Sequence, residues 1–322
     1  MRIKYFSLLM LFSIIFISCE DGFSPKGTYD ERYSLNCIIR GDTSLHVATA
    51  YKSYDVPNID PYENKNNSFI DGAFIRMWRG NDEVHIFRDS TMPRTDTSRF
   101  DTDIKYYYIK DFVPKEGDFL EIEALLPNGR RLKSSTTIPQ QVKRNEEESD
   151  LEFLHESKDF LKTKWLVKNS DQVYLPKLYI DYLVNKDGVN VRYKKVVTWK
   201  KVQVGNDVKY IYPSPSRDYE IYYDMDVIKE AMEEISENDS VKTNYTIRSF
   251  VLELSIFDAN LSTYYFTVGL SDNSFAAGLG EGDYSNIENG FGIFGSFYSQ
   301  EFKILLSTGY VNSFGYRLYD WY

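Results

Sequence analysis

Apolar and polar residues alternate along much of the chain after residue 30. A repeat of two positions is typical of strands that bury one face, because successive side chains of a strand point to opposite sides of a sheet. The sequence therefore predicts a mainly β protein. In the first half of the chain, the positions expected on the buried face are Leu45, Val47 and Tyr51, then Ala73, Ile75 and Met77, and then Val84 and Ile86 beyond a Gly-Asn turn.

Turn signals divide these runs into hairpins. The segment GDFLEIEALLPNGRRLKSSTTIP carries Asn128-Gly129 between two strand-like runs, and this dipeptide readily takes the positive φ angles of a tight hairpin turn. Short strands recur without a long helical repeat, which is typical of a β-sandwich. We therefore expect a sandwich domain over residues 31–140.

A second β-rich domain is expected over residues 141–322. It begins near the charged stretch QQVKRNEEESD, which is either a linker or a solvated loop. Strand-like runs rich in Tyr, Val and Ile follow, with a Lys-Asp-Gly turn at residues 186–188. After the helix described next, the chain returns to β character in SFVLELSIFDANLSTYYFTVGL, and it ends with the β-like FKILLSTGY and with YRLYDWY.

One segment of the second domain predicts an amphipathic helix. In DMDVIKEAMEEISEND, residues 224–239, apolar residues recur at helical spacing, and Asp224 or Asp226 is placed to cap the first turn. We expect the apolar stripe to pack on a sheet, with a partner-binding helix as the alternative. The stripe consists of Val227, Ile228, Ala231, Met232 and Ile235.

The first residues have the order of a secretory signal. Arg2 and Lys4 precede an apolar stretch that is too short to span a bilayer, and Ser18 stands directly before Cys19. A small residue followed by cysteine resembles a bacterial lipobox, which implies a signal peptide over residues 1–18 and fatty acyl chains on Cys19. The alternative is an ordinary signal peptide followed by a chance cysteine. Residues 19–30 would then form a tether to the membrane.

Two acidic residues follow the cysteine at once. Glu20 and Asp21 resemble the acidic signal that directs lipoproteins to the outer face of an outer membrane, although they would also suit the start of a solvated tether. If Cys19 carries lipid, Cys37 has no disulfide partner in the monomer. Cys37 lies in the apolar run YSLNCIIR, so we expect it to act as a small buried hydrophobe.

The net charge of the chain argues against two classes of binding partner. The chain has 38 basic and 48 acidic residues and a formal net charge of −10, and removal of Arg2 and Lys4 would make it more negative. This charge opposes binding to nucleic acid and to anionic lipid. Aromatic residues make up 16% of the chain, which is ample core material for a β fold and argues against disorder.

Local motifs for catalysis or cofactor binding are weak. The chain has three histidines, His46, His85 and His155, and it has neither an HExxH nor a GxSxG motif. His46 and His85 occupy strand positions, where an ordinary surface or boundary imidazole is expected. We predict no catalytic residue, no metal site and no cofactor, although a pair of carboxylates brought together by the fold would leave no local signal.

Two glycine-rich segments resemble nucleotide loops only in spacing. GFGIFG at residues 290–295 matches G-x-G-x-x-G, but a β-like run follows it where a helix would be needed. We expect a tight turn that lets two layers approach closely. GLGEGD at residues 278–283 fails the same test.

Acidic and aromatic clusters have two interpretations each. Asp96, Asp101 and Asp103 offer oxygen ligands for Ca²⁺, but they lack the spacing of an EF-hand, and a solvated loop is the favoured interpretation. The aromatic runs at residues 106–108 and 264–266 would either stack on sugars or peptides or pack in the core, and we favour packing.

Several segments resemble one family. Cys19 in its lipobox, YSLNCII, IDGAFIRMWRG, RLKSSTTIP and YSNIENGFGIFGSF are similar to the Bacteroidota lipoproteins assigned to domain-of-unknown-function family 4249. The resemblance covers nearly the whole chain after Cys19. It implies an amino-terminal Ig-like or transthyretin-like sandwich, a second β domain, and partnership with a TonB-dependent receptor that acts as a transporter. No catalytic residue is established for the family, so the resemblance implies none here.

These observations together predict a non-enzymatic lipoprotein of the outer membrane, facing the cell exterior, that assists a TonB-dependent transporter by binding its substrate. Trp78 and Trp199 are candidates for the contact surface, with core packing as their alternative role. A fimbrial or adhesive subunit is the second hypothesis, since it would also be β-rich and lipid-anchored. An extracellular hydrolase is the third, and it would need a cleft with convergent carboxylates.

Overall fold

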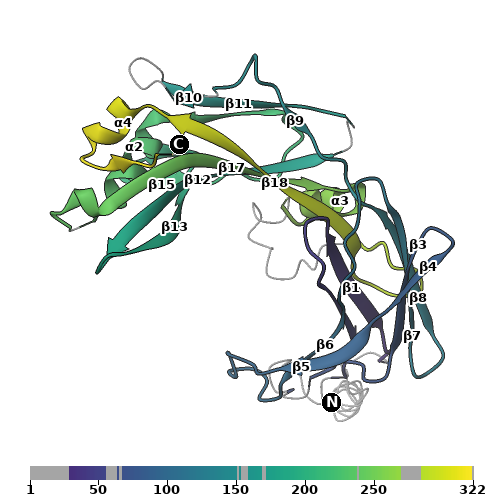
Figure 1. Ribbon diagram of the computed structural model, residues 1–322. Coiled ribbons are helices and arrows are strands. Elements are labelled where there is room, and N and C mark those ends of the chain that lie inside the picture. Colours follow the sequence, from purple (N-terminus) through teal and green to yellow (C-terminus); the bar gives the residue numbers. More distant parts are fainter. Residues whose placement is uncertain are drawn as a thin grey trace, which may run out of the picture.

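The computed structural model describes residues 29–55, 64, 67–150, 152–153, 159–168, 172–237, 239–269 and 284–320. The fold is mainly β, as the alternating pattern predicts (Figure 1). Its strands form one large curved sheet, with smaller sheets and helices packed against it.

The large sheet runs through both halves of the molecule. Among the described residues it contains ten strands, eight of which form its main path while β10 and β19 pair at the side. The spatial order of the main path is β13 (Val189–Val197), β12 (Val173–Lys186), β17 (Tyr245–Phe257), β18 (Phe294–Leu306), β1 (Tyr33–Arg40), β2 (His46–Lys52), β6 (Ile104–Ile109) and β5 (Arg88–Met92). The two side strands are β10 (Glu152–Phe153), which pairs with β18, and β19 (Arg317–Leu318), which pairs with β17.

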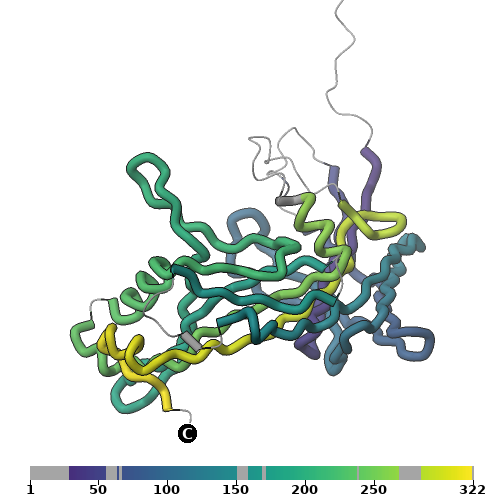
Figure 2. The backbone as a smooth tube through the Cα atoms, turned by 90° about the horizontal axis from the view of Figure 1, so that it is seen from above, coloured from purple at the N-terminus to yellow at the C-terminus, as the bar shows by residue number. Residues whose placement is uncertain are grey.

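Strand β18 joins the two halves. It pairs antiparallel with β17 over residues 297–304 and parallel with β1 over residues 294–297. Figure 2 shows β17 and β18 side by side, with β18 continuing to the amino-terminal half. Strand β18, from near the end of the chain, therefore lies beside β1, the first strand of the chain, in the same sheet.

A β-sandwich forms the amino-terminal half, which confirms the predicted fold class. A four-stranded sheet, ordered β4-β3-β7-β8, covers the β1, β2 and β6 part of the large sheet. Its core is drawn from residues 35–138 and also from Ile287 and Phe294. Residues far beyond position 140 therefore help to build this half. The covering strands are β3 (Phe74–Arg79), β4 (Glu83–Ile86), β7 (Phe119–Leu125) and β8 (Arg131–Thr137).

Several expected features of this half are present. Ile75 and Met77 are fully buried, and Cys37 is 1% exposed, so it serves as the small buried hydrophobe that the sequence predicts. The Asn128-Gly129 segment turns the β7–β8 hairpin, where Gly129 has a φ of 84°.

The facing of β2 differs from the prediction. His46, Ala48 and Ala50 are buried, whereas Val47 is 40% exposed and Leu45 lies outside the strand. The expectation that Leu45, Val47 and Tyr51 mark the buried face is therefore wrong. A shift of one residue exchanges the two faces of a strand, and the side chains that fit against β1 here are the small ones.

In β4, too, the buried and exposed faces are exchanged relative to the prediction. Val84 and Ile86 are 48% and 53% exposed, so the prediction that they are buried is also wrong. The side chain between them, His85, lies against the ring of Phe112 instead, with ring centroids 4.4 Å apart.

The carboxy-terminal half has its own core. A three-stranded sheet, ordered β16-β11-β9, and helices α2 and α4 pack on the β12, β17 and β18 part of the large sheet. The largest buried side chain of this core is Trp165. The bounds of these elements are β9 (Lys143–Arg144), β11 (Phe160–Leu166), β16 (Glu220–Asp224), α2 (Met225–Glu234) and α4 (Thr308–Ser313).

A separate hairpin and one short turn complete this half. Strands β14 and β15 pair only with each other among the described residues, and η4 is a 3₁₀ turn before β17. The predicted turn between β12 and β13 is present, with positive φ at both Asp187 and Gly188. The bounds are β14 (Lys200–Val204), β15 (Asp207–Ile211) and η4 (Lys242–Asn244).

Helix α2 carries the predicted apolar stripe into the core of the carboxy-terminal half. All five residues of the stripe are buried. Asp224 occupies the N-cap position, but its side chain makes no capping hydrogen bond, and Asp226 lies in the first turn. The helix is therefore held by packing rather than by its cap.

Two further helices were not expected. Residues 259–269, predicted to be β, form α3 (Ala259–Gly269), and the Ser-Thr-Gly-Tyr end of FKILLSTGY enters α4. Asp258 accepts a hydrogen bond from the backbone N–H of Leu261, and Ser307 accepts one from that of Tyr310. These local caps outweigh the β propensity of the aromatic residues that follow them.

We expect the two N-cap positions to respond differently to alanine. Ser307→Ala should lower the free energy of unfolding by about 1 kcal/mol, because the bond to the Tyr310 N–H is lost. Asp224→Ala should change it by less than about 0.5 kcal/mol, because its side chain caps nothing. Urea unfolding of both variants measures the difference, and equal losses would contradict it.

Candidate functional site

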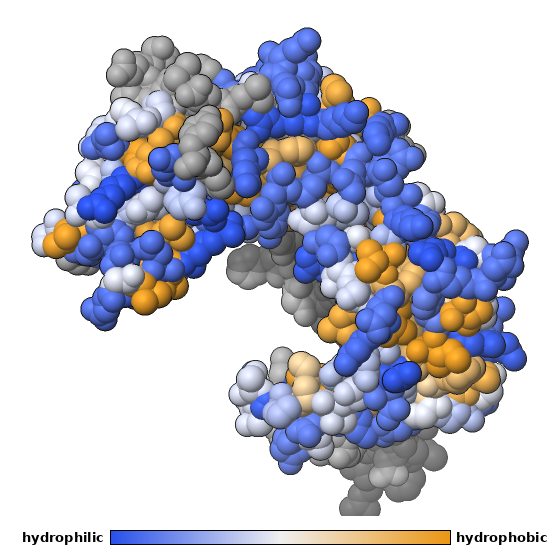
Figure 3. Space-filling view, in the orientation of Figure 1, coloured by the Kyte–Doolittle hydropathy of each residue, from blue (hydrophilic) through white to orange (hydrophobic). Residues whose placement is uncertain are grey.

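Both cores lie on the same side of the large sheet. Along β18, Phe294 points into the amino-terminal core, while Phe302 and Ile304 belong to the carboxy-terminal core. All three are even-numbered, so the odd-numbered side chains of β18 point to the other side. The sheet curves around that other side, and Figure 3 shows the molecule hollowed there (compare Figure 1).

We call this surface the concave face. It crosses five neighbouring strands, and α3 lies at one end of it, where Leu261 packs against Gly295. Its residues are Ile38 and Arg40 of β1, Phe297, Ser299 and Glu301 of β18, Glu253 and Ser255 of β17, Lys177 and Tyr179 of β12, and Lys194 of β13.

A cavity of about 560 Å³ lies in the concave face beside α3. Lys177, Glu253 and Glu301 stand in register on three neighbouring strands, and Ser255 and Ser299 form the next pair. Cross-strand neighbours lie about 4.8 Å apart, so these groups form short rows of donors and acceptors on one floor. Clefts of this size with convergent polar groups are typical of ligand sites.

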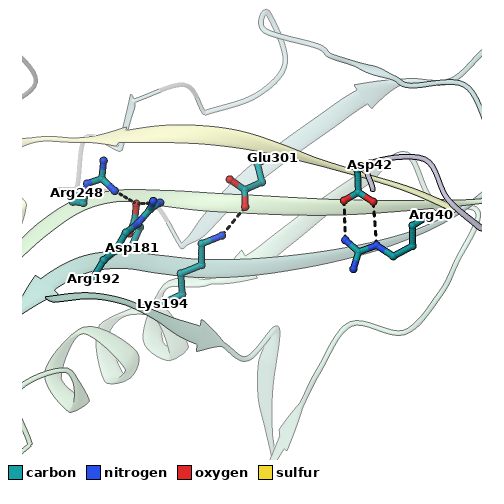
Figure 4. A network of polar contacts seen from close by, with 7 residues as sticks. All are labelled: Arg40, Asp42, Asp181, Arg192, Lys194, Arg248 and Glu301. Carbon is teal, nitrogen blue, oxygen red and sulfur yellow. Dashed lines mark hydrogen bonds and ion pairs between the residues drawn. The ribbon is translucent and has the colours of Figure 1, made fainter. Parts of the chain in front are cut away.

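Ion pairs order the rest of the concave face (Figure 4). Fully buried Asp181 accepts two hydrogen bonds of 2.8 Å from Arg192 and one of 3.1 Å from Arg248. A β-bulge between Asp181 and Tyr182 shifts the register with β17 beside Arg248. Two guanidinium groups on one carboxylate compensate for its burial. The hydrogen bond to Asp181 raises the pKa of Arg192.

Two further ion pairs lie on the same surface. The Lys194 ammonium is 2.6 Å from a carboxylate oxygen of Glu301, and Arg40 binds Asp42 through two nitrogens at 3.0 and 2.8 Å. Positive and negative groups therefore alternate along the concave face, although the chain as a whole carries −10. The surface offers directional hydrogen bonding more than a field of one sign.

Aromatic rings border the cavity. Tyr265 of α3 is 39% exposed, and its ring centroid lies 4.9 Å from that of Phe257. Tyr179 is half-buried, with the Lys194 ammonium 5.5 Å from its ring centroid. Rings held in this way present flat apolar surface next to polar groups.

The two aromatic runs have mixed outcomes. In the run at residues 106–108, Tyr107 packs in the amino-terminal core as expected, while Tyr106 and Tyr108 point to the opposite side of the large sheet, which is the side of the concave face. The run at residues 264–266 lies on α3, so the prediction that it belongs to a strand is wrong. Its helical position is what brings Tyr265 to the cavity.

A second cavity, of about 610 Å³, lies where β8 meets α3. Asp258 lines it and is 6% exposed. Its carboxylate accepts hydrogen bonds from the Thr136 hydroxyl and the Leu261 N–H, so it links the two halves. Burial raises the pKa of Asp258 to about 6, and these hydrogen bonds oppose the rise. The Asp258 carboxylate therefore connects β8 to α3 more than it offers a contact to a ligand.

Both histidines of the described residues, His46 and His85, lie against the ring of Phe112. His46 is 2% exposed, which corrects the expectation of a surface or boundary imidazole, and its Nε2 lies 2.9 Å from the carbonyl oxygen of Phe112. Burial lowers the pKa of His46. The ring centroid of His85 lies 4.4 Å from that of Phe112, and its Nε2 lies 2.8 Å from a carboxylate oxygen of Glu83. His155 lies outside the described residues.

Neither candidate tryptophan lies on the concave face. Trp78 is a half-buried residue of β3, with the Arg76 guanidinium 4.9 Å from its ring centroid. Trp199 packs against the carboxy-terminal core and donates a hydrogen bond of 2.7 Å to the carbonyl of Tyr222. Packing is therefore the role that the structure gives to Trp199.

The acidic loop has the geometry of a solvated loop. Asp96, Asp101 and Asp103 are all exposed, and Asp96 accepts a hydrogen bond of 2.9 Å from the backbone N–H of Ser98. Within the described ranges, no group of three or more His, Cys, Asp or Glu side chains is placed to hold a metal ion.

The GFGIFG segment is the close approach of layers that the sequence predicts. Its backbone pairs with β1, through bonds of 2.9 Å from Leu35 N–H to the Phe291 carbonyl and from Cys37 N–H to the Ile293 carbonyl. Gly292 has a φ of 108°. A Cβ on Gly290, Gly292 or Gly295 would come closer than 3.0 Å to a neighbouring atom.

Two of the sequence candidates cannot be placed. Cys19, with the proposed signal peptide and most of the tether, and GLGEGD at residues 278–283 lie outside the described residues. No helix in the described part of the chain is long and apolar enough to cross a membrane. Neither the models of known protein families nor the curated protein sequences match this chain.

Proposed function

We propose that this protein is a lipoprotein of the outer membrane, anchored through Cys19 and facing the cell exterior, that captures a ligand on the concave face for a TonB-dependent transporter. The chemistry we assign to it is binding and presentation without catalysis. A tether that holds a binding domain beside a pore raises the local concentration of ligand at the pore mouth, and the gain is set by the length of the tether.

The concave face is the observation that carries this proposal. It combines a cavity of about 560 Å³, rows of donors and acceptors, and exposed aromatic surface on a rigid sheet. The two larger cores lie on the other side of the sheet, and on this side a smaller cluster of Val173, Phe257, Leu261 and Ile293 packs α3 against one end of the face. Support for the anchor comes from the residues around Cys19 alone.

Anchoring can be tested separately from binding. In an outer-membrane bacterium, we expect the wild-type chain to fractionate with the outer membrane and to yield an amino-terminal peptide that begins at acylated Cys19. Cys19→Ala should lose the acyl mass and leave the outer-membrane fraction, since stable anchoring requires the lipid. An unacylated Cys19 in the wild-type protein would contradict the anchor.

Affinity purification from outer membranes tests the partner. Co-purification of a TonB-dependent transporter supports the proposal. A ladder of identical subunits would instead support the fimbrial or adhesive hypothesis. Turnover of a glycan or peptide by the purified protein, without either partner, would support the hydrolase hypothesis.

A further inference from the structure

We propose that the ligand of the concave face is a neutral oligosaccharide, bound across β12, β17 and β18 beside α3. This inference rests on the proposed function, because it names the ligand class for the same surface. Three properties of the surface lead to it: its hydrogen-bonding rows, its alternating charges and its aromatic border.

The hydrogen-bonding rows suit hydroxyl groups. Lys177 can only donate hydrogen bonds, whereas the carboxylates of Glu253 and Glu301 can only accept them. These groups stand next to each other in register, with the hydroxyls of Ser255 and Ser299 in the neighbouring row. A sugar hydroxyl both donates and accepts, so vicinal hydroxyls can bridge a cation and a carboxylate on adjacent strands.

The alternation of charge favours a neutral ligand over a charged one. The Lys194–Glu301 and Arg40–Asp42 pairs, at 2.6 and 2.8 Å, place opposite charges side by side across the surface. A polyanion would meet Glu253 and Glu301 of the cavity, and a polycation would meet Lys177 of the cavity and Lys194, which is paired with Glu301, each within the distance over which charges interact. A neutral chain of hydroxyls avoids both repulsions.

The backbone disfavours a peptide in the same place. Strand β12 lies between β13 and β17, and β17 lies between β12 and β18, so their backbone N–H and C=O groups already pair within the sheet. An extended peptide gains its affinity from such groups at a free strand edge. Laid on the concave face, its amides would have only side chains as partners.

The aromatic border supplies apolar surface for a sugar ring. Tyr265 is 39% exposed and lines the cavity, and the buried ring of Phe257 lies against it at a centroid distance of 4.9 Å. The C–H face of a pyranose can stack on such a ring while its hydroxyls reach the polar rows. A tyrosine provides this area with little loss of side-chain freedom.

Titration calorimetry on the full-length lipidated protein in detergent tests the ligand class. The probes are maltohexaose, cellohexaose, xylohexaose and mannohexaose, with hexagalacturonate as the acidic probe and an acidic and a basic decapeptide as the peptide probes. We expect at least one neutral hexasaccharide to bind, with an affinity that changes less than about twofold between about 50 and 500 mM salt, since no net charge is neutralised.

Matched variants locate the binding. Tyr265→Ala and Lys177→Ala should each weaken binding of that hexasaccharide by about tenfold or more, and Tyr265→Phe, which keeps the ring, by less. Tyr222→Ala removes a tyrosine of β16 that is 40% exposed and lies on the covering sheet, so it should leave the affinity within about twofold. Thermal unfolding of each variant confirms that it is folded.

The outcomes separate this inference from the proposed function. Binding of hexagalacturonate or a peptide alone, weakened by Lys177→Ala, would overturn the neutral oligosaccharide while leaving ligand capture by the concave face intact. A neutral ligand that is insensitive to Tyr265→Ala and Lys177→Ala would overturn the assigned site. Failure of every probe to bind overturns the inference, and if no transporter co-purifies, the proposed function fails as well.

Discussion

Replacing Gly292 with alanine is expected to lower the free energy of unfolding by more than about 4 kcal/mol, the range in which a single substitution prevents folding. Gly292 has a φ of 108°, which an L side chain rarely adopts. Its missing Cβ faces the carbonyl of Leu35 and the side chain of Asn36. The strain of the positive φ and the clash of the Cβ therefore add. The clash cannot be relieved, because the β1 backbone cannot move away without losing its hydrogen bonds to Phe291 and Ile293.

Gly309→Ala is the matched control. Gly309 lies in helix α4, a Cβ there would meet no atom within 4 Å, and its φ is not positive. Alanine should therefore leave stability unchanged or raise it by up to about 1 kcal/mol. Urea unfolding and the yield of soluble protein measure both variants. If Gly292→Ala proved as stable as Gly309→Ala, the close approach of the GFGIFG segment to β1 would be wrong.

Asp258→Asn is expected to stabilise the protein at neutral pH and to have little effect in acid. The pKa of Asp258 is raised from its ordinary 3.8 to about 6 by burial. The folded state therefore holds a proton that the unfolded state releases, and this favourable contribution is complete below about pH 4 and lost as the pH rises through about 6. A shift of about two units corresponds to about 3 kcal/mol, which is the gain expected for asparagine at pH 8.

Comparing the wild-type protein with Asp258→Asn isolates the contribution of the Asp258 carboxyl group. Other shifted carboxylates, such as Glu123, whose pKa is lowered by Arg76 and other basic neighbours against the effect of burial, change stability with pH in both proteins equally. The groups around Asp258 itself are Thr136, Ser296 and the phenol of Tyr284, with Lys168 lining the same cavity. A difference in unfolding free energy that stays constant between pH 4 and pH 8 would show that Asp258 titrates normally.

Local signals predicted those features that depend on a few neighbouring residues. The apolar stripe of α2, the turns at Asn128-Gly129 and Asp187-Gly188, and the buried role of Cys37 are all confirmed. In each case, spacing or turn chemistry within about ten residues is sufficient to specify the structure. The close approach at GFGIFG is also confirmed, because glycine at three near positions has few other uses beside a strand.

Which face of a strand is buried was less predictable. Both faces of β2 carry residues that a core accepts, and the choice of His46, Ala48 and Ala50 depends on the space left by β1. Helix α3 was missed because its aromatic residues favour strands, while its start depends on Asp258, held in place by Thr136 from a distant strand. A hydrogen bond between side chains more than one hundred positions apart therefore overrides the local preference for a strand.

The candidate site had one weak signal in the sequence. Glu253 and Ser255 interrupt the apolar run FVLELSIF at alternate positions, which indicates one polar face on a long strand. Their partners Lys177 and Glu301 stand about 76 and 48 residues away, and only the register of β12, β17 and β18 brings them together.

The sequence by itself determined the mainly β character, the hairpin turns, the amphipathic helix and the lipobox-like start, because each rests on periodicity or chemistry within a short segment. The tertiary structure alone decided that β18 returns to pair with β1, that both large cores share one side of a single sheet, and that polar groups from five strands face the other side. Strand pairing is set by backbone hydrogen bonds that every sequence can make. Which strands pair therefore follows from how the side chains of the whole chain fill the two cores.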